Sequence, residues 1–364
     1  MQQKGRGATE NPASRYLARH SEPVDDGWHV PVAEGTDQTL AEPAEDKPPK
    51  PRTELYPDRT VTLITRNQSP DIGFDRSINP YKGCEHGCIY CFARPTHAYL
   101  DLSPGLDFET KIFYKTNVRE RLVEELGKPR YRCRTLAMGT NTDPYQPAEK
   151  QKRVTRTVLE TLLEAKHPVS LVTKSQLILR DMDLLREFAR LELISVAVSL
   201  TTLSNELKTK LEPRTASPAA RLKVIRELHA AGVPVGAMVA PVIPFINDHE
   251  IEDIVAVGTQ AGAATMNYIL LRLPLEVKDL FRDWLDVHYP LKAERVMSAI
   301  RSARGGKAYD AWWGTRMRGE GSIADLIGNR FRAALKRHGI LDAKSPRLRT
   351  DLFQPPGQRQ ISLF

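Results

Sequence analysis

The sequence predicts an α/β fold in which a full or partial (β/α) barrel forms the central part of a 364-residue chain. The first observation is an alternation, between about residues 111 and 271, of short β-branched runs with amphipathic stretches of helical length. Such an alternation is typical of a parallel sheet with right-handed crossovers. The second observation is that small polar residues directly follow several of these runs, where a barrel collects its ligands. A hydrophobic content of 41% allows a sizeable core.

The predicted elements follow in order along the chain. Strands are expected at 60–65, 111–114, 135–138, 169–173, 193–200, 235–242 and 266–271, because these runs are short and rich in β-branched residues. Helices are expected at 118–126, 149–165, 182–189, 219–231 and 250–261, where apolar residues recur at helical spacing. Gly127 and Gly232 mark the ends of two helices, and Asn247 with Glu250 has the spacing of a capping box.

The composition divides the chain into four parts. Residues 1–59 are polar and proline-rich, which predicts a disordered or loosely ordered segment. Residues 60–288 form the barrel core, residues 289–343 a basic and mostly helical extension, and residues 344–364 a flexible tail. Because no apolar run reaches the roughly 20 residues that span a bilayer, and the first 20 residues lack a signal-peptide core, we expect a cytoplasmic protein without membrane contact.

Three of the four cysteines, Cys84, Cys88 and Cys91, lie within eight residues of one another. A reducing compartment makes disulfides a poor explanation for this cluster. Three thiolates on one tight loop can instead converge on an inorganic centre, and Gly87 lets the backbone turn closely around it. A structural zinc site with His86 as a fourth ligand is the alternative, although no second C-x-x-C pair is present.

The spacing C-x-x-x-C-x-x-C, with Tyr90 before the last cysteine, resembles the signature of the radical S-adenosylmethionine (SAM) enzymes. The resemblance implies a partial (β/α)6 TIM-type barrel, and a 4Fe-4S cluster held by Cys84, Cys88 and Cys91. One iron stays open for SAM, whose reductive cleavage yields a 5′-deoxyadenosyl radical. Residues 77–91, 139–149, 173–184 and 199–213 together are similar to the spore photoproduct lyase-like, or DNA repair photolyase-like, branch of these enzymes.

The same resemblance implies roles for residues at the predicted strand ends. The expected SAM contacts are Tyr90, Thr140, Thr142, Lys174, Ser199 and Thr201, and the expected catalytic residues are Tyr90 and Lys174. The alternatives are ordinary ones: residues 139–149 are also typical of a turn, a lone lysine is usually a solvated surface residue, and Glu212 with Arg214 is also compatible with a surface ion pair.

Two departures separate this chain from the lyases that it resembles. Those lyases carry a hydrogen-donor cysteine at the end of the second barrel strand, where this chain has residues 139–142 and no cysteine. The aromatic residue after the last cluster cysteine is Phe92, which lacks a hydroxyl group. Direct reversal of a thymine photoproduct is therefore not expected. Cys133, at the start of its strand, is predicted to be a buried core thiol.

The positive charge of the chain is concentrated near its C-terminus. Residues 289–350 contain 14 Lys/Arg and 5 Asp/Glu, whereas residues 1–60 contain 8 and 11. Trp312 and Trp313 precede Arg316 and Arg318, a pattern that is typical of nucleic-acid-binding surfaces. The alternative is a tryptophan pair packed on the barrel with solvated arginines. The charge balance favours a polyanionic substrate or partner.

The final residues, Gln360–Phe364, resemble the bacterial sliding-clamp-binding peptide, and we hypothesise that they dock the chain on a DNA polymerase clamp. The resemblance also implies an electron donor such as flavodoxin or ferredoxin. The predicted function is thus a radical SAM enzyme that acts on nucleic acid in DNA repair or modification. One alternative is a radical SAM enzyme acting on a protein or a small molecule. The other is a non-catalytic nucleic-acid-binding module that carries zinc or a cluster.

Overall fold

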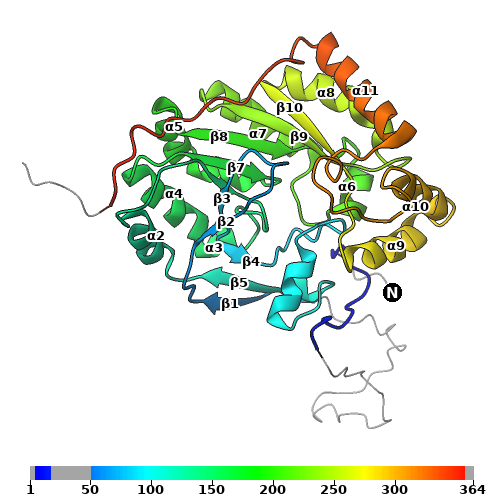
Figure 1. The fold of residues 1–364 in the computed structure, drawn as a ribbon, viewed down its shortest axis with the longest axis horizontal. Coiled ribbons are helices and arrows are strands. Elements are labelled where there is room, and N and C mark those ends of the chain that lie inside the picture. The colour runs from blue at the N-terminus through cyan, green and yellow to red at the C-terminus, as the bar shows by residue number, and fades with distance from the viewer. Residues whose placement is uncertain (1–4, 18–50, 357–364) are drawn as a thin grey trace, which may run out of the picture.

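The computed structural model describes residues 5–17 and 51–356. A seven-stranded sheet in the order β10-β9-β8-β7-β6-β3-β2 runs through this part of the chain (Figure 1). Its strands are β2 Ile64–Arg66, β3 Arg76–Ile78, β6 Leu136–Met138, β7 Val169–Thr173, β8 Ile194–Ser199, β9 Val235–Val242 and β10 Thr265–Leu270. The six strands from β3 to β10 are parallel to their neighbours, and β2 is antiparallel to β3. The predicted partial barrel of six parallel strands is confirmed.

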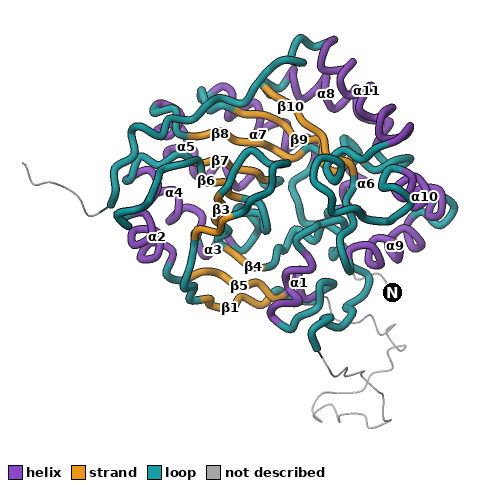
Figure 2. Tube along the Cα trace, in the orientation of Figure 1, coloured by secondary structure: helices purple, strands orange, loops and turns teal. Residues whose placement is uncertain are grey.

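Helices cover the outer face of this sheet and its connections (Figure 2). They are α2 Val118–Leu126, α3 Glu149–Lys152, α4 Val154–Glu164, α5 Met182–Arg190, α6 Asn205–Leu211, α7 Pro218–Ala230 and α8 Ile251–Gln260. The predicted helix over 149–165 is interrupted at Arg153, whose φ of 53° is left-handed. The core between sheet and helices consists of branched aliphatic residues such as Val158, Leu171, Ile225 and Ile254, all fully buried. The regular spacing of these residues along each element explains why the alternation of strands and helices could be predicted from the sequence.

The first barrel strand is not the one that the sequence predicted. The run at 111–114 forms β5 (Lys111–Lys115), but β5 lies in a separate three-stranded sheet with β1 (Glu54–Asp58) and β4 (Tyr81–Lys82). The barrel begins at β3, and β4 separates this strand from the cysteine loop, residues 83–92. A strand of three residues is too short to show a periodicity, and a single strand carries no signal of its pairing partner. Strand β1 also places ordered chain before residue 60.

The predicted capping box at the start of α8 is wrong. The Asn247 side chain does not cap the helix; it accepts a hydrogen bond from the backbone N–H of Ile243 and donates to the carbonyl of Thr201. The Glu250 carboxylate instead accepts hydrogen bonds from the Thr202 hydroxyl group and from a backbone N–H of the β8–α6 connection. Both side chains therefore tie connections of the barrel to one another.

The C-terminal extension, residues 289–343, is helical, as predicted, with α10 Ala293–Ser302 and α11 Gly321–Arg337, and α9 Val277–His288 directly precedes it. Helices α9 and α10 bury Phe281 and Trp284 in a second core that also contains Ile89 and Tyr90 of the cysteine loop. Helices α9 and α10 therefore pack against the cysteine loop in this second core. Helix α11 packs on α8 at the far side of the barrel (Figure 1). None of the helices in residues 5–17 and 51–356 is both long and apolar enough to span a membrane.

Candidate active site

The cysteine loop follows β3 and β4 at the end of the barrel where strands terminate. Gly83 and Gly87 have φ values of 80° and 66°, which side-chain-bearing residues rarely adopt. The N–H of Gly87 donates to the Cys84 carbonyl at 3.4 Å, and the N–H of Cys91 donates to the Cys88 carbonyl at 3.2 Å. Cys84 and Cys88 are buried and Cys91 is half-buried. The glycines thus allow two successive turns that bring the three cysteines onto one compact loop.

The thiols lie near enough to influence one another electrostatically. Burial raises the pKa of Cys84, and the neighbouring Asp143 and the other two cysteines raise it further. Burial likewise raises the pKa of Cys88, while the Lys174 ammonium group partly opposes this. As isolated groups these thiols favour the protonated form, so thiolates at this position need a positively charged centre. The donor set therefore fits an iron-sulfur cluster bound through three thiolates.

The zinc alternative required His86 as the fourth ligand. Its Nδ1 atom lies 3.3 Å from Oδ2 of Asp143, and both side chains are almost inaccessible to solvent. Within residues 5–17 and 51–356, no three His, Cys, Asp or Glu side chains are arranged to hold a single metal ion. Cys133 lies at the opposite end of the sheet, before β6. The sequence predicted a buried core thiol, but the thiol of Cys133 is only half-buried. Partial burial raises its pKa to about 12.

A buried ion pair anchors the cysteine loop from one side. Arg94 donates from Nε to the Cys88 carbonyl at 2.9 Å and from Nη2 to Oε1 of Glu109 at 2.5 Å. Both side chains are fully buried. The same carboxylate accepts hydrogen bonds from the backbone N–H groups of Gly7 and Ala8, at 3.0 and 2.8 Å. The pair thereby joins the cysteine loop to the N-terminal segment.

This role of residues 5–17 was missed by the sequence analysis, which expected loose structure before residue 60. Arg6 is buried and donates to the Glu109 carbonyl at 2.7 Å. A Cβ atom added at Gly7 would lie 1.7 Å from the carbonyl oxygen of Gly87. The available signal was the Gly-Arg-Gly sequence at residues 5–7, because glycine permits so close an approach of two backbones.

Residues 139–149 lie against the cysteine loop from the other side. The Thr142 hydroxyl group donates to the Gly83 carbonyl at 2.6 Å, and Gln146 accepts from the backbone N–H of Glu85 at 2.9 Å. Thr140 is half-buried, with its hydroxyl oxygen 3.3 Å from Oδ1 of Asn79. The segment is therefore more than a turn, since two of its side chains hold the cysteine loop in place.

Asp143 connects this segment to the next strand. Its carboxylate accepts hydrogen bonds from the backbone N–H of Lys174 at 2.8 Å and from the Thr173 hydroxyl group at 2.7 Å. Burial alone would raise the pKa of this carboxyl group, but the adjacent His86 and these hydrogen bonds outweigh burial and lower it to about 2. Asp143 thus stays ionised and fixes the backbone from which the Lys174 side chain extends.

A second polar network lies beside Cys88. The Tyr90 hydroxyl group donates to Oε2 of Glu212, and Cys88 Sγ lies 3.9 Å from the same oxygen. Oε1 of Glu212 accepts from Nη2 of Arg221 at 2.5 Å, and both side chains are fully buried. Burial raises the pKa of Glu212, but Arg221 and Lys174 more than compensate and the net shift is downward. The surface ion pair that was one interpretation of Glu212 is therefore wrong.

The predicted site residues divide into two groups in the structure. Tyr90, Thr201 and Lys174 lie together: the Tyr90 and Thr201 hydroxyl oxygens are 3.4 Å apart, and Lys174 Nζ lies 5.9 Å from the centre of the Tyr90 ring. Ser199, buried at the end of β8, shares the Ala240 carbonyl as a hydrogen-bond acceptor with Thr201. Thr140 and Thr142 lie on the opposite side, in the loop that follows β6. The SAM contacts of all six residues stay predictions.

The C-terminal loop 305–319 lies beside this site. Nε of Arg316 donates to Asp71 at 2.5 Å, and the Arg318 guanidinium carbon lies 5.4 Å from the centre of the Tyr268 ring. Arg316 is therefore committed to contacts within the chain, whereas Arg318 stays exposed with its guanidinium group over the Tyr268 ring. Trp312 and Trp313, in contrast, are 76% and 60% exposed, so the interpretation of a packed tryptophan pair is wrong.

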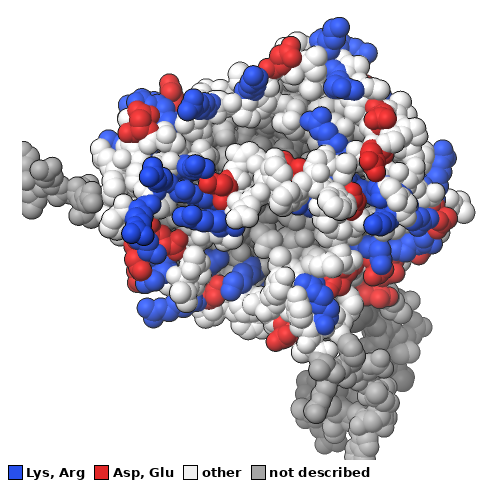
Figure 3. Space-filling model, viewed as in Figure 1, with Lys and Arg blue, Asp and Glu red and all other residues white. Residues whose placement is uncertain are grey.

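Lys and Arg side chains surround the hollowed middle of the face drawn in Figure 3, with Asp and Glu interspersed near the rim.

The network of Tyr90 and Glu212 could be predicted only in part from the sequence. Glu212 was recognisable as a charged residue in the long connection after the strand at 193–200, but its partner Arg221 lies within an amphipathic helix, α7, where arginine is common.

Comparisons with known proteins agree with this geometry. The family model of the radical SAM superfamily matches residues 78–257. An uncharacterized protein of Mycobacterium tuberculosis is 40% identical over 230 residues, which cover 63% of this chain and 68% of that protein. An uncharacterized protein of Methanocaldococcus jannaschii is 28% identical over 219 residues, 60% of this chain and 78% of that protein.

Among solved structures, a spore photoproduct lyase complexed with dinucleoside spore photoproduct superposes with a TM-score of 0.55 at 15% identity. The match covers 78% of this chain and 79% of the lyase. A mutant of the same lyase gives a TM-score of 0.56 at 16% identity, covering 79% and 80%. Similarity at this level of identity shows a common fold.

Proposed function

This chain belongs to the radical SAM superfamily of enzymes, and we propose that it cleaves SAM reductively at a 4Fe-4S cluster held by Cys84, Cys88 and Cys91. When bound, the cluster supplies the electron that breaks SAM and leaves a 5′-deoxyadenosyl radical to abstract hydrogen from a substrate. Membership in the superfamily speaks against the non-catalytic zinc module. The observation that carries the proposal is the placement of three cysteines on one compact loop whose turns contain glycines, with Cys88 and Cys91 near enough to raise the pKa of Cys84.

The surrounding residues then have separable roles. Lys174 is half-buried, extends from an anchored backbone toward Tyr90, and makes no salt bridge within residues 5–17 and 51–356, so it is free to bind the SAM carboxylate. Tyr90, Ser199 and Thr201 are the proposed contacts of the ribose or carboxylate, and to bind SAM their hydroxyl groups would exchange the hydrogen bonds that they donate to Glu212 and to the Ala240 carbonyl. Thr140 remains available for the SAM amino group. Thr142 is likewise proposed to contact SAM, from a position that its hydrogen bond to the Gly83 carbonyl of the cysteine loop fixes.

This part of the proposal is tested by anaerobic reconstitution followed by iron and sulfide analysis and an assay for 5′-deoxyadenosine. We expect about four irons per chain and reductant-dependent SAM cleavage, both lost in Cys88→Ala. Cys133→Ala is the matched control, since that thiol lies at the other end of the sheet, and it should retain both. Stoichiometric zinc without SAM cleavage, or cleavage that survives Cys88→Ala, would overturn the assignment.

We further propose that the substrate is nucleic acid. The support is the balance of +9 over residues 289–350 and the exposed tryptophan pair beside the site. Phosphate contacts predict that the logarithm of oligonucleotide affinity falls linearly with the logarithm of salt concentration. Binding that is absent, or insensitive to salt, would favour a protein or small-molecule substrate instead.

Two partners are proposed in addition. The enzyme needs a one-electron donor, such as a flavodoxin or ferredoxin, to reduce the cluster. The clamp-binding peptide, Gln360–Phe364, lies outside the described residues, and its proposal rests on the sequence alone. Full-length chain should bind a bacterial sliding clamp, and a chain truncated after Arg359 should not; equal binding by the two would refute clamp docking.

A further inference from the structure

The loop that carries the exposed tryptophans is held at several points. The backbone N–H of Gly314 donates to Oδ1 of Asp71 at 2.7 Å, and Arg304 donates to the carbonyls of Thr315 and Arg316 at 3.0 and 2.7 Å. Arg304 is itself buried and also donates to two carbonyls at the end of β10. The loop is therefore fixed on both sides of its turn.

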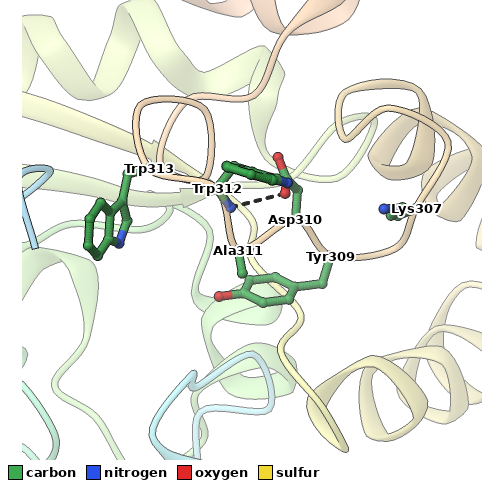
Figure 4. A pocket seen from close by; sticks show the side chains of 6 residues that line it. All are labelled: Lys307, Tyr309, Asp310, Ala311, Trp312 and Trp313. Carbon is green, nitrogen blue, oxygen red and sulfur yellow. Dashed lines mark hydrogen bonds between the residues drawn. The ribbon is translucent and has the colours of Figure 1, made fainter.

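Asp310 braces the inside of the same loop. Its carboxylate accepts a hydrogen bond from the backbone N–H of Trp312 at 3.0 Å (Figure 4). It accepts a second from the Thr315 hydroxyl group at 2.9 Å. Although these hydrogen bonds fix the backbone of the loop, the indole rings of Trp312 and Trp313 stay exposed to solvent. Large aromatic side chains on a fixed loop are characteristic of binding surfaces, because their area is presented without loss of flexibility on binding.

The two indoles border a pocket of about 560 Å³ lined by Lys307, Tyr309, Asp310, Ala311, Trp312 and Trp313. In Figure 4, the Trp312 and Trp313 rings extend to different sides of the loop, and the Tyr309 ring lies below Trp312. The lining thus offers aromatic faces with one ammonium group, from Lys307, at the side. This combination suits a flat, π-bearing group attached to an anionic backbone.

The pocket is linked to the cysteine loop through one arginine. Arg272, two residues beyond β10, donates from Nη2 to the Tyr309 hydroxyl group at 3.3 Å. Its guanidinium carbon lies 5.4 Å from the centre of the Phe92 ring. Phe92 directly follows Cys91 and is 49% exposed. A group bound at the tryptophan pocket is therefore separated from the proposed cluster loop by Tyr309, Arg272 and Phe92.

We propose that this pocket binds unpaired nucleobases, so that the substrate is single-stranded nucleic acid or a locally opened duplex rather than regular duplex. This inference rests on the nucleic-acid substrate of the proposed function. Stacking on aromatic faces requires bases whose faces are free, and every base has such a face. Chemistry on a base also requires that the base leave the helical stack. The local excess of positive charge complements the phosphate backbone of such a strand.

The test is fluorescence anisotropy of the reconstituted full-length chain with end-labelled oligonucleotides. A single strand, its perfect duplex and a duplex with one unpaired base are compared at one salt concentration. We expect the single strand and the interrupted duplex to bind at least about tenfold more tightly than the perfect duplex. Equal affinity for all three would overturn the proposal.

Substitutions locate the binding on the loop. Trp312→Ala and Trp313→Ala should each weaken single-strand binding about tenfold, whereas Trp312→Phe and Trp313→Phe should restore most of it. Leu291→Ala is the matched control, since Leu291 is 99% exposed in the same extension and lines no part of the pocket. Unchanged single-strand affinity in both alanine variants would show that the bases bind elsewhere.

Cleavage of SAM without substrate separates this inference from the proposed function. The Leu291→Ala control should form 5′-deoxyadenosine at the wild-type rate, because Leu291 lies outside both the cysteine loop and the pocket. Normal cleavage with no preference for unpaired bases refutes the pocket alone, and loss of cleavage in the wild-type chain refutes the radical SAM assignment.

Discussion

The phenol group of Tyr90 donates a hydrogen bond to the carboxylate of Glu212, which lies 122 residues further along the chain. Tyr90 belongs to the cysteine loop after the first barrel strand, and Glu212 follows α6, beyond the fourth, β8. The same carboxylate pairs with Arg221 at 2.5 Å in a fully buried environment. One carboxylate therefore joins the cluster loop, the β8 connection and helix α7.

Glu212→Gln should destabilise the chain strongly, because it leaves the buried Arg221 guanidinium group without a counter-charge. Removing one partner of a buried pair costs about 3–5 kcal/mol. The free energy of unfolding from denaturant titration measures this, and SAM cleavage should fall as Tyr90 loses its charged acceptor. Glu206→Gln is the control, since its side chain is 78% exposed in its pair with Lys210 and its loss should change little. Equal stability of both variants would contradict the network.

Asp143 predicts a specific dependence of stability on pH. Its pKa is lowered in the folded chain to about 2, so its ionised form stabilises the fold above the unfolded pKa of 3.8. That contribution, roughly 2 kcal/mol, is lost as the pH falls from about 4 to about 2. Asp143→Asn should therefore be less stable than wild type at pH 7, and the difference should shrink below pH 4. Asp279→Asn, whose side chain is 72% exposed, should show no such convergence.

Gly7→Ala should weaken cluster binding although residue 7 lies far from the cysteines in sequence. The added methyl group would collide with the Gly87 carbonyl oxygen, and two backbones can separate only by moving the cysteine loop or the N-terminal segment. We expect lower iron content after reconstitution and faster loss of iron to a chelator. Gly73→Ala is the control, because its methyl group would meet no atom within 4 Å. Wild-type iron retention in Gly7→Ala would refute the coupling.

Lys174→Met should weaken SAM binding about tenfold while leaving the iron content unchanged, since the variant removes the charge but not the anchored backbone. Equilibrium binding of SAM to the reconstituted, unreduced chain measures this directly. Lys150→Met, which alters an exposed lysine in α3, should bind SAM normally. If Lys174→Met binds SAM as wild type does, its role lies with the substrate or with loop stability.

The sequence by itself determined the barrel and the identity of the cluster-binding loop. Alternating β-branched and amphipathic segments encode five of the six parallel strands, β6 to β10, because burial repeats with a local period. The three cysteines are equally local, since their spacing within eight residues is enough to define a common centre. Both signals survive in the linear chain because the residues that produce them are neighbours along it.

Only the tertiary structure decided how that loop is held and what lies beside it. Gly7 against Gly87, Arg94 with Glu109, and Tyr90 with Glu212 are contacts between segments with no shared periodicity. Each depends on where connections of different length return to the sheet. The sequence does not distinguish a solvated charged residue from one that is buried with a partner, because distant segments of the chain determine which residues are buried.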